Sequence, residues 1–517
     1  MGFRFTVFLG AICFAFSTSA LAMQVDPELL TKLRHNSNEK LTVLAHLDGQ
    51  FDLSSVEKLR LSPQEKAKYL VKALEEQTAK GSEPLVRLLK SPHIRGVDEI
   101  KYLWITNSVK ITAASTVIEK LLSLNGIESL MLDKPRESAE LFDSAKSSMV
   151  VPEGTMAAQP KISWGIEKVR ATELWAQGID GKGIIVAMID SGANLDHPDL
   201  KPNLWKNPGE TGIDANGKDK ATNGIDDDNN GYIDDVVGWN FEDKTNNPKD
   251  ENGHGSQTAG IVGGNGTNGT KTGVAPKATL MILRSCCNTG TQIFESNTWE
   301  AMQYAVKNGA RVISMSLSAK HPSKPSYAKW RRASEVLLAA GMVHINSAGN
   351  RGSDFTPNNI GAPATNPPPW FHPKQEYSSA PTSIITIGAT DQEDVLREYS
   401  STGPVTWESI EEYKDFPYDK GNKTGLIRPD VCGPSEVPST AMTGTGYTAD
   451  FGGTSSATPN IAGVTALLLQ AKPTLTVAQV LESLQMSAVK VETEFNNKCG
   501  AGRVDAVAAV EYARAHF

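Results

Sequence analysis

The chain has 517 residues, of which 39% are hydrophobic and 21% are charged, and its formal net charge is −8. This length and composition are typical of a soluble globular protein with two or more domains. No basic stretch is dense enough for a nucleic-acid surface, so we exclude nucleic acid as a partner. No segment beyond the N-terminus approaches the roughly 18 uninterrupted apolar residues of a membrane span, so we expect none.

Residues 1–22 have the pattern of a signal peptide. Arg4 supplies a positive start, residues 5–16 are apolar, and Ala20-Leu21-Ala22 matches the cleavage pattern of small residues. The apolar run is too short to span a bilayer, although an uncleaved anchor is the alternative. We therefore expect a secreted or extracellular protein, with a periplasmic or cell-surface location also open.

Residues 23–133 have the pattern of a small separate domain. Ser62 and Glu65 predict a capping box at the start of a helix, with Pro63 at its first position. The other expected elements are strands at 41–46, 100–111 and 126–132 and a helix at 113–124. This alternation predicts a small α+β domain of ferredoxin-like type.

The remainder divides into a linker and a large domain. Residues 134–161 lack apolar periodicity, and exposed linkers of this kind are where proteolysis concentrates. In residues 162–517, strands expected at 183–189, 279–283, 312–317, 342–346 and 384–388 alternate with helices such as 297–308 and 327–340. This alternation predicts a mostly parallel sheet covered by helices on both faces.

Three polar residues stand at the ends of such elements, in the order Asp190, His254 and Ser455. A serine hydroxyl is a poor nucleophile without an adjacent base, and the imidazole of His254 titrates near neutral pH. Asp190 can orient that imidazole and stabilise its charged form. Each residue alone is more often a cap, a turn residue or an exposed residue. Together, in these contexts, they predict a hydrolytic triad.

Asn350 is a candidate hydrogen-bond donor to the carbonyl oxygen that becomes negatively charged during the reaction. It closely follows an apolar strand, and an uncharged amide suits that role. The second candidate donor is the N–H of Ser455, at the start of a helix. The alternative for Asn350 is a turn residue after Gly349.

These segments resemble the subtilisin-like serine peptidases, the subtilases. The matching runs are Asp190-Ser-Gly192, His197-Pro-Asp-Leu200, His254-Gly-Ser-x-x-Ala-Gly260, Gly273-Val-Ala-Pro276, Ser316-Leu317, Ala348-Gly-Asn350 and Gly453-Thr-Ser455-x-Ala-x-Pro459. The resemblance covers roughly residues 162–510 and implies the three-layer α/β fold of subtilisin. It also implies endopeptidase action on proteins or peptides through an acyl-enzyme. Residues 23–133 then resemble a propeptide, which assists folding and acts as an intramolecular inhibitor until it is cut away within 134–161.

The resemblance also implies substrate-binding strands. Ser316, Leu317 and Ser318 resemble the edge strand that walls the pocket for the substrate residue preceding the cut. The family usually has Gly at the position of Ser318, so we expect bulky aromatic residues to be disfavoured there. A second specificity strand is expected near residues 288–292, and an extended substrate would pair with such strands.

The loop 226–237 has the pattern of a calcium-binding loop. Oxygen-bearing side chains stand at its positions 1, 3 and 5, and Gly231 stands at position 6. The twelfth position is Val237 instead of Glu, so a nearby acid must substitute. The predicted ligands are Asp226, Asp228, Asn230, Asp234 and Asp235. We expect structural Ca²⁺ here and no cofactor for catalysis, with a solvated acidic turn as the alternative.

Export would place Cys286, Cys287, Cys432 and Cys499 in an oxidising compartment, where disulfides persist. Four cysteines allow three pairings, and the sequence cannot choose among them. A bridge between the adjacent Cys286 and Cys287 would be strained. If any bridge forms, we favour Cys432 with Cys499.

The sequence thus predicts a secreted subtilisin-like serine endopeptidase made as a zymogen. One alternative is a catalytically silent binding protein on the same fold, which the intact Asp, His, Ser and Asn argue against. Another is an esterase with the same triad. The missing Gly-x-Ser-x-Gly motif argues against it, as does the position of the nucleophile last in the chain.

Overall fold

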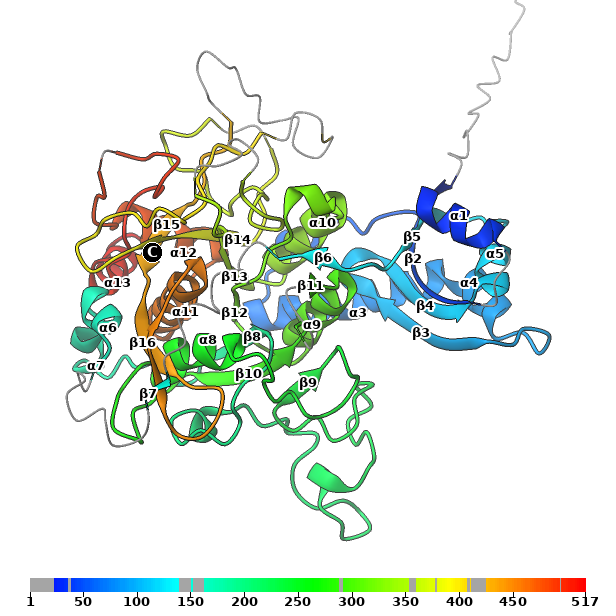
Figure 1. The fold of residues 1–517 in the computed structure, drawn as a ribbon, viewed down its shortest axis with the longest axis horizontal. Helices are drawn as coiled ribbons and strands as arrows, with labels where there is room; N and C mark the ends of the chain where they lie inside the picture. The colour runs from blue at the N-terminus through cyan, green and yellow to red at the C-terminus, as the bar shows by residue number, and fades with distance from the viewer. Residues whose placement is uncertain are drawn as a thin grey trace, which may run out of the picture.

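The computed structural model describes residues 23–35, 39–138, 150–151, 162–287, 292–352, 359–376, 379–406, 410, 425–492 and 494–517. The predicted signal peptide and most of the predicted linker lie outside these residues. Among the described helices, none is both long and apolar enough to cross a bilayer. A small N-terminal unit packs against a large unit that begins at residue 162 (Figure 1).

The N-terminal unit is a five-stranded sheet in the order β1-β5-β2-β4-β3, with helices packed on it. Its strands are β1 (Gln24–Val25), β2 (Lys40–Leu47), β3 (Val97–Leu103), β4 (Ser108–Ala114) and β5 (Ile127–Leu132). Its helices are α1 (Pro27–Arg34), α2 (Ser54–Glu57), α3 (Pro63–Gly81), α4 (Glu83–Leu89) and α5 (Ser115–Leu121). The central β2 pairs antiparallel with β4 and β5. This is an α+β arrangement, as the sequence predicts.

One expectation for this unit is correct in detail and another is wrong. The predicted capping box starts α3, with the Ser62 N–H donating to Glu65 at 2.8 Å and the Glu65 N–H donating to Ser62 Oγ at 3.4 Å. A single strand over 100–111 is not formed. Instead β3 and β4 make an antiparallel hairpin, and Asn107 turns the chain in a left-handed conformation (φ 49°). The apolar pattern runs through the turn because Trp104 and Ile105 are buried against the large unit.

The large unit is built on a seven-stranded parallel sheet in the order β15-β14-β13-β12-β8-β10-β9. Its strands are β8 (Ile185–Asp190), β9 (Gly238–Asn240), β10 (Thr279–Arg284), β12 (Val312–Met315), β13 (Val343–Ser347), β14 (Ile384–Thr390) and β15 (Val431–Pro434). All five strands expected from the sequence are present. The other two, β9 and β15, have 3 and 4 residues and were not expected from the sequence.

Helices cover both faces of this sheet and complete the three layers. They are α6 (Trp164–Lys168), α7 (Ala171–Trp175), α8 (His254–Gly263), α9 (Glu295–Lys307), α10 (Tyr327–Ala339), α11 (Thr454–Ala471), α12 (Val477–Met486) and α13 (Ala506–His516). Successive residues of β8 face different cores, which explains why the strand is apolar throughout. Ala187 and Ile189 pack with α9 and α10, whereas Val186 and Met188 pack with α8 and α11. The predicted three-layer α/β fold is confirmed.

The two units share one hydrophobic core. Leu70 and Leu74 of α3, together with Trp104, belong to the same buried cluster as Trp299 of α9 and Trp330 of α10. Figure 1 shows α9 and α10 on the side of the large unit that faces the N-terminal sheet. These two helices therefore form the surface on which the N-terminal unit packs.

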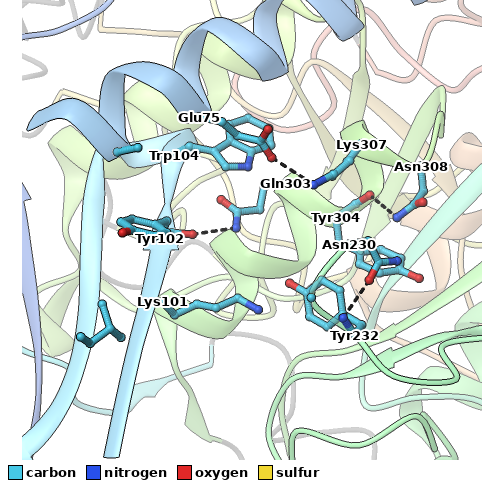
Figure 2. Close-up of a pocket in the computed structure, with 13 residues that line it drawn as sticks. Glu75, Lys101, Tyr102, Trp104, Asn230, Tyr232, Gln303, Tyr304, Lys307 and Asn308 are labelled. Carbon is cyan, nitrogen blue, oxygen red and sulfur yellow. Dashed lines mark hydrogen bonds and ion pairs between the residues drawn. The ribbon is translucent and has the colours of Figure 1, made fainter. Parts of the chain in front are cut away.

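Polar contacts between the two units lie at the edge of this core, along α9 (Figure 2). Glu75 of α3 forms an ion pair with Lys307 at 3.1 Å. The side-chain amide of Gln303 donates to the backbone carbonyl of Tyr102 at 3.0 Å. The N-terminal unit is thus attached to α9 by charge and hydrogen bonding as well as by apolar burial.

Both described pieces of the predicted linker also pair with the large unit. The strand β6 (Arg136–Glu137) runs antiparallel to β11 (Gln292–Ile293), and the next residue, Ser138, bridges to Ala319. The strand β7 (Val150–Val151) adds to a hairpin of β16 (Val437–Thr440) and β17 (Tyr447–Phe451). The sequence predicted an exposed linker here and did not anticipate this pairing.

Candidate active site

Asp190, His254 and Ser455 are each positioned by a regular element of the large unit. Asp190 is the last residue of β8, His254 is the first residue of α8, and Ser455 is the second residue of α11. Their exposed fractions are 1%, 1% and 2%. The carboxyl end of a central parallel strand therefore lies close to the start of a helix, a common location for functional residues in such sheets.

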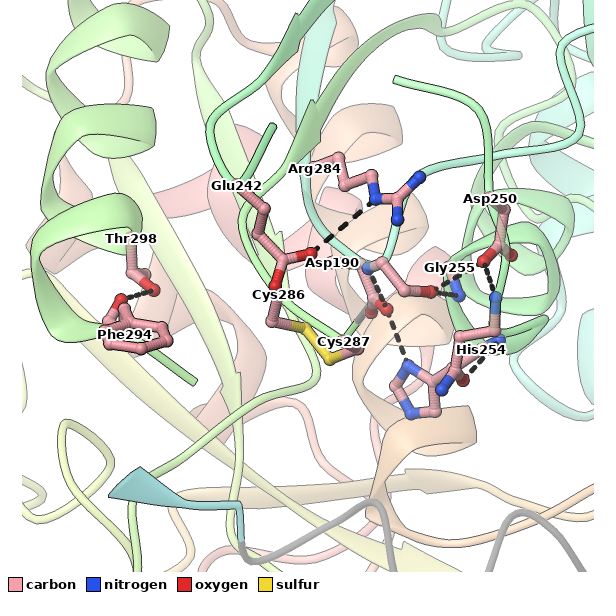
Figure 3. Close-up of a disulfide and its surroundings, with 12 residues drawn as sticks. Asp190, Glu242, Asp250, His254, Gly255, Arg284, Cys286, Cys287, Phe294 and Thr298 are labelled. Atoms are coloured by element: carbon pink, nitrogen blue, oxygen red, sulfur yellow. Dashed lines mark hydrogen bonds and ion pairs between the residues drawn. A yellow bond between two sulfur atoms is a disulfide. The ribbon is translucent and has the colours of Figure 1, made fainter. Parts of the chain in front are cut away.

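Asp190 and His254 are in direct contact. His254 Nδ1 lies 2.7 Å from Asp190 Oδ1 (Figure 3). The same carboxylate accepts the N–H of Ser191 at 2.7 Å and the hydroxyl of Thr258 at 3.3 Å. Because an ionised carboxylate only accepts, Nδ1 carries the proton and Nε2 is the ring atom that can take another. The contact with Asp190 therefore fixes the orientation of the His254 ring.

Asp250, which was not among the residues predicted from the sequence, holds the turn that leads into α8. Its Oδ1 accepts the hydroxyl of Ser191 and the N–H groups of Asn252 and Gly253, each at 2.9 Å. Its Oδ2 accepts the N–H and the hydroxyl of Ser256 at 2.8 and 2.6 Å. Through Ser191 this network joins the end of β8 to the start of α8. The signal that could have found it is an acid followed by Asn252-Gly253, a pattern typical of side-chain-capped turns.

The loop between β17 and α11 brings the segment that carries Ser455 next to His254. Phe451, four residues before Ser455, packs edge-on against the His254 ring with the two centroids 5.5 Å apart. Ser316 Oγ donates to the carbonyl of Ser455 at 3.0 Å, which fixes the first turn of α11. Within the described part of the chain, the buried Ser455 hydroxyl has no hydrogen-bond partner. The structure therefore brings Ser455 into the neighbourhood of His254 but does not form the hydrogen bond that a nucleophile makes with its base.

Asn350 lies against the same helix start. Its Oδ1 accepts the N–H of Thr454 at 2.8 Å and the Thr454 hydroxyl at 2.9 Å. Its amide nitrogen lies on the side of Gly453, where a Cβ atom would come within 2.8 Å of it. Gly453 also has a positive φ of 78°, so a side chain there would be both strained and obstructed. The amide is therefore held with its donor group next to Gly453 and the N-terminus of α11.

The predicted substrate-binding residues follow β12. Ser316 contacts Ser455, as described above, and the Leu317 carbonyl accepts the Asn346 amide at 3.2 Å. Ser318 is fully buried, and a Cβ at Gly361 would lie 2.3 Å from its hydroxyl. Of the second strand predicted at 288–292, only Gln292 lies within the described residues, and it belongs to β11.

Three acidic side chains form a cluster beside the predicted calcium loop. Carboxylate oxygens of Glu210, Asp226 and Asp228 all lie within 4.8 Å of one another. Glu210 was not predicted, because it precedes the loop motif. It is fully buried, its Oε2 has no hydrogen-bond partner among the described residues, and burial raises the pKa of its carboxyl. A cation among these oxygens would relieve both the burial cost and the mutual repulsion.

The other predicted ligands surround this cluster in different ways. The Asn230 amide donates to Asp228 at 3.2 Å and to Asp235 at 3.0 Å. Asp235 is buried, receives the Tyr304 hydroxyl, and has a pKa raised to about 6 by burial. Asp234 accepts the N–H of Gly224 at 3.2 Å and is not part of the three-carboxylate group. Asn230 therefore links the cluster to Asp235 by hydrogen bonds, whereas Asp234 hydrogen-bonds the backbone of the loop.

Both cysteine pairs are disulfides. Cys432 is bonded to Cys499, which is the pairing that the sequence favoured. Cys286 and Cys287 are bonded as well, with Cα atoms 3.7 Å apart, a pairing that the sequence disfavoured. This second bridge follows β10 directly, and Figure 3 shows it beside Asp190 and His254.

Comparison with known proteins decides the family. The family model of the subtilases matches residues 181–502, which include Asp190, His254, Asn350 and Ser455. The chain belongs to the subtilase family. Characterised subtilases are serine endopeptidases, that is, hydrolases.

Several curated subtilases are similar to the chain. Bacillopeptidase F of Bacillus subtilis is 26% identical over 467 residues, which is 86% of this chain but 29% of that protein. Thermitase of Thermoactinomyces vulgaris is 29% identical over 360 residues, covering 68% of this chain and 96% of thermitase. Subtilisin DY of Bacillus licheniformis is 27% identical over 347 residues, covering 67% of this chain and 98% of that subtilisin. The chain thus spans nearly the whole of two of these subtilases and less than a third of Bacillopeptidase F.

We predict that Asp250→Ala lowers the stability of the large unit substantially. The change removes five hydrogen bonds and leaves the donors in Ser191 and the 252–256 turn without their acceptor. An unsatisfied buried donor costs about 1–3 kcal/mol, so we expect a loss of about 3 kcal/mol or more in the free energy of unfolding. Chemical denaturation in a Ser455→Ala background measures this without self-digestion. The control, Asp196→Ala, removes an exposed carboxylate that pairs with Lys201 and should change the stability by less than about 0.5 kcal/mol. Equal stabilities of the two variants would contradict the role of Asp250.

Proposed function

We propose that this chain is a secreted serine endopeptidase that is made as a zymogen and cleaves peptide bonds through an acyl-enzyme. The observation that carries this proposal is the contact of 2.7 Å between buried Asp190 and His254, next to the segment that carries Ser455. Membership of the subtilase family supports the same reaction class. Export through a signal peptide at 1–22 remains part of the proposal.

In the proposed reaction, Ser455 Oγ attacks the peptide carbonyl while His254 Nε2 takes its proton. Asp190 keeps the other ring nitrogen protonated and stabilises the imidazolium that forms. His254 then returns the proton to the leaving amine, and water releases the acyl group by the same steps in reverse. The Asn350 amide and the Ser455 N–H are the proposed donors to the oxyanion. Loss of one such donor typically costs about 3–4 kcal/mol of transition-state stabilisation.

The N-terminal unit is proposed to be a propeptide that inhibits the enzyme until it is cut away. Residues 136–138, at the start of the linker that follows this unit, pair with β11 on one side and bridge to Ala319 on the other. The N–H of Lys320 donates to the Glu137 carbonyl at 2.9 Å, as it would to an extended substrate. While these contacts last, a peptide substrate cannot pair with the same strands. The similarity to Bacillopeptidase F extends beyond the large unit, so it includes part of the N-terminal region.

Calcium is proposed to bind at Glu210, Asp226 and Asp228. The donors fit this ion, because they are flexible oxygen ligands and Glu210 is buried with one oxygen unpartnered among the described residues. Bound Ca²⁺ would supply positive charge that offsets the repulsion of the carboxylates and would hold the insert 207–237 in place. It takes no part in the proposed chemistry.

Ser318 is proposed to limit the size of the substrate side chain that precedes the cut. Its hydroxyl fills space next to Gly361, a position at which even a methyl group would collide with it. A large aromatic side chain would have to displace this hydroxyl. We therefore propose that small or medium side chains are preferred there.

The wild-type protein should process itself, and Ser455→Ala should not. We expect intact mass and N-terminal sequencing to show that the wild type loses its N-terminal unit by a cut within residues 139–161, whereas Ser455→Ala keeps it. Removal of the nucleophile abolishes acyl-enzyme formation, so this variant is the matched control. Identical processing of both proteins would show that another protease is responsible. If neither protein is cut, and the wild type hydrolyses no peptide after activation by an added protease, the peptidase proposal fails.

Calcium should raise the melting temperature of the Ser455→Ala protein, and Glu210→Gln should remove most of that increase. An ion that binds only the folded state adds about 2.7 kcal/mol at a concentration of 100 times its dissociation constant. Thermal unfolding with Ca²⁺ and with chelator measures the effect. Asp234→Asn is the control variant and should keep the response, because Asp234 is not part of the cluster. Melting temperatures that do not depend on calcium would contradict the site.

Ser318→Gly should shift substrate preference toward aromatic residues. Removing the hydroxyl opens the space in front of Gly361, so we expect kcat/KM for a Phe peptide to rise at least several-fold relative to an Ala or Leu peptide. The comparison uses peptides that are identical except at the residue preceding the cut. An unchanged preference would show that Ser318 does not set the size of this pocket.

A further inference from the structure

Arg136 is buried against the large unit, and we call the groups that receive its guanidinium, Glu295 and the Ser323 carbonyl, the Glu295 pocket. Only 7% of the residue is exposed. Its guanidinium Nε lies 3.1 Å from Glu295 Oε2, and its Nη1 donates to the backbone carbonyl of Ser323 at 2.9 Å. Two donors of one guanidinium therefore meet two acceptors that lie in different parts of the large unit.

The pocket is held by groups of the large unit alone. Glu295, with 2% exposure, is the first residue of α9. Its carboxylate accepts the N–H and the hydroxyl of Ser326, both at 2.9 Å, and the indole N–H of Trp330 at 2.5 Å. These three donors orient the carboxylate without any help from Arg136. Loss of the segment that carries Arg136 would therefore leave the acid held in place.

The backbone around Arg136 is an extended strand that pairs with the large unit. Arg136 pairs with Ile293 and Glu137 pairs with Gln292 in an antiparallel ladder, while Ser138 bridges to Ala319. Alternate side chains of an extended strand point to opposite sides, and accordingly Arg136 and Ser138 are buried whereas Glu137 is exposed. Consider a peptide that binds in place of this segment. The residue at the position of Arg136, two residues before the one at the position of Ser138, would then place its side chain in the Glu295 pocket.

We propose that Glu295 and the Ser323 carbonyl form a subsite that selects arginine in extended peptide substrates, two residues upstream of the residue that bridges to Ala319. The proposal rests on the proposed peptidase function and adds a substrate class to it. Arginine fits better than lysine, because its planar fork presents two separated donors whereas an ammonium is a single point charge. Arg136 would then occupy this subsite as the arginine of the protein's own segment.

The pocket should discriminate strongly because it is buried. A neutral side chain in its place would leave the Glu295 carboxylate covered and without its cation, which is costlier than leaving an exposed acid unpaired. Sites of this kind reject the wrong partner as well as attracting the right one. Selection should therefore be visible mainly as a difference in KM between charged and neutral side chains.

The test uses processed wild-type protein and internally quenched peptides that copy the chain from residue 132 to ten residues beyond its own cut. The peptides carry arginine, lysine or citrulline at the position of Arg136. Citrulline keeps the shape of arginine without its charge. We expect kcat/KM for the arginine peptide to exceed that for citrulline at least tenfold, mainly through KM, with lysine between them. Mass spectrometry confirms that all peptides are cut at the same bond.

Two variants assign this preference to the pocket. Glu295→Gln should bring the arginine-to-citrulline ratio close to one. The control, Glu335→Gln, changes an acid on α10 that lies beside Arg331 and Arg332, and it should keep the wild-type ratio. Equal cleavage of arginine and citrulline peptides by the wild type would overturn the proposal, and this result needs no variant. A ratio that persists in Glu295→Gln would overturn the assignment to Glu295. If the wild type cuts none of the peptides, it is the peptidase function that fails.

Discussion

The hydrogen bond between Asp190 and His254 is the contact on which the candidate site depends. It joins the end of a central parallel strand to the start of a helix, and both side chains are buried, so neither can be oriented by water. The carboxylate is held by the Ser191 N–H and the Thr258 hydroxyl, and the turn before His254 is held by Asp250. A buried charge is tolerated when such donors surround it. The imidazole is consequently fixed before any substrate arrives, which is what general base catalysis requires.

The second constraint is the way the N-terminal unit covers the large one. It packs on α9 and α10 through a shared core, and the strand β6 that follows it pairs with β11. The helix α9 serves both contacts, because Trp299 lies in the shared core and Glu295 receives Arg136. The same helix therefore links recognition of the folded N-terminal unit to recognition of an extended chain in the cleft. On the proposed function, this extended segment would carry the side chains that the substrate-binding strands prefer.

Much of this architecture could be predicted from the sequence, for physical reasons. The strands of the parallel sheet are buried on both faces, so they appear as continuous apolar runs that end at Asp190 or shortly before Asn350. The hairpin at Trp104 was missed because its turn is also buried, and an apolar turn looks like a continued strand. Phe451 and Glu210 were missed because each acts through contacts distant in the sequence. Asp250 was missed because only its bond to Ser191 connects its local turn to the end of β8. The pairing of residues 136–138 with the cleft could not be seen, since a short strand that is stabilised by its partner has no periodicity of its own.

The most direct test of the central claim is covalent labelling of the activated protein with a fluorophosphonate, which reacts with a serine only when a neighbouring base activates it. Peptide mapping by mass spectrometry then locates the label. The account predicts one label per chain, on Ser455, and no labelling when His254 is replaced by Ala. Labelling elsewhere, or labelling of Ser455 at the same rate without His254, would contradict it.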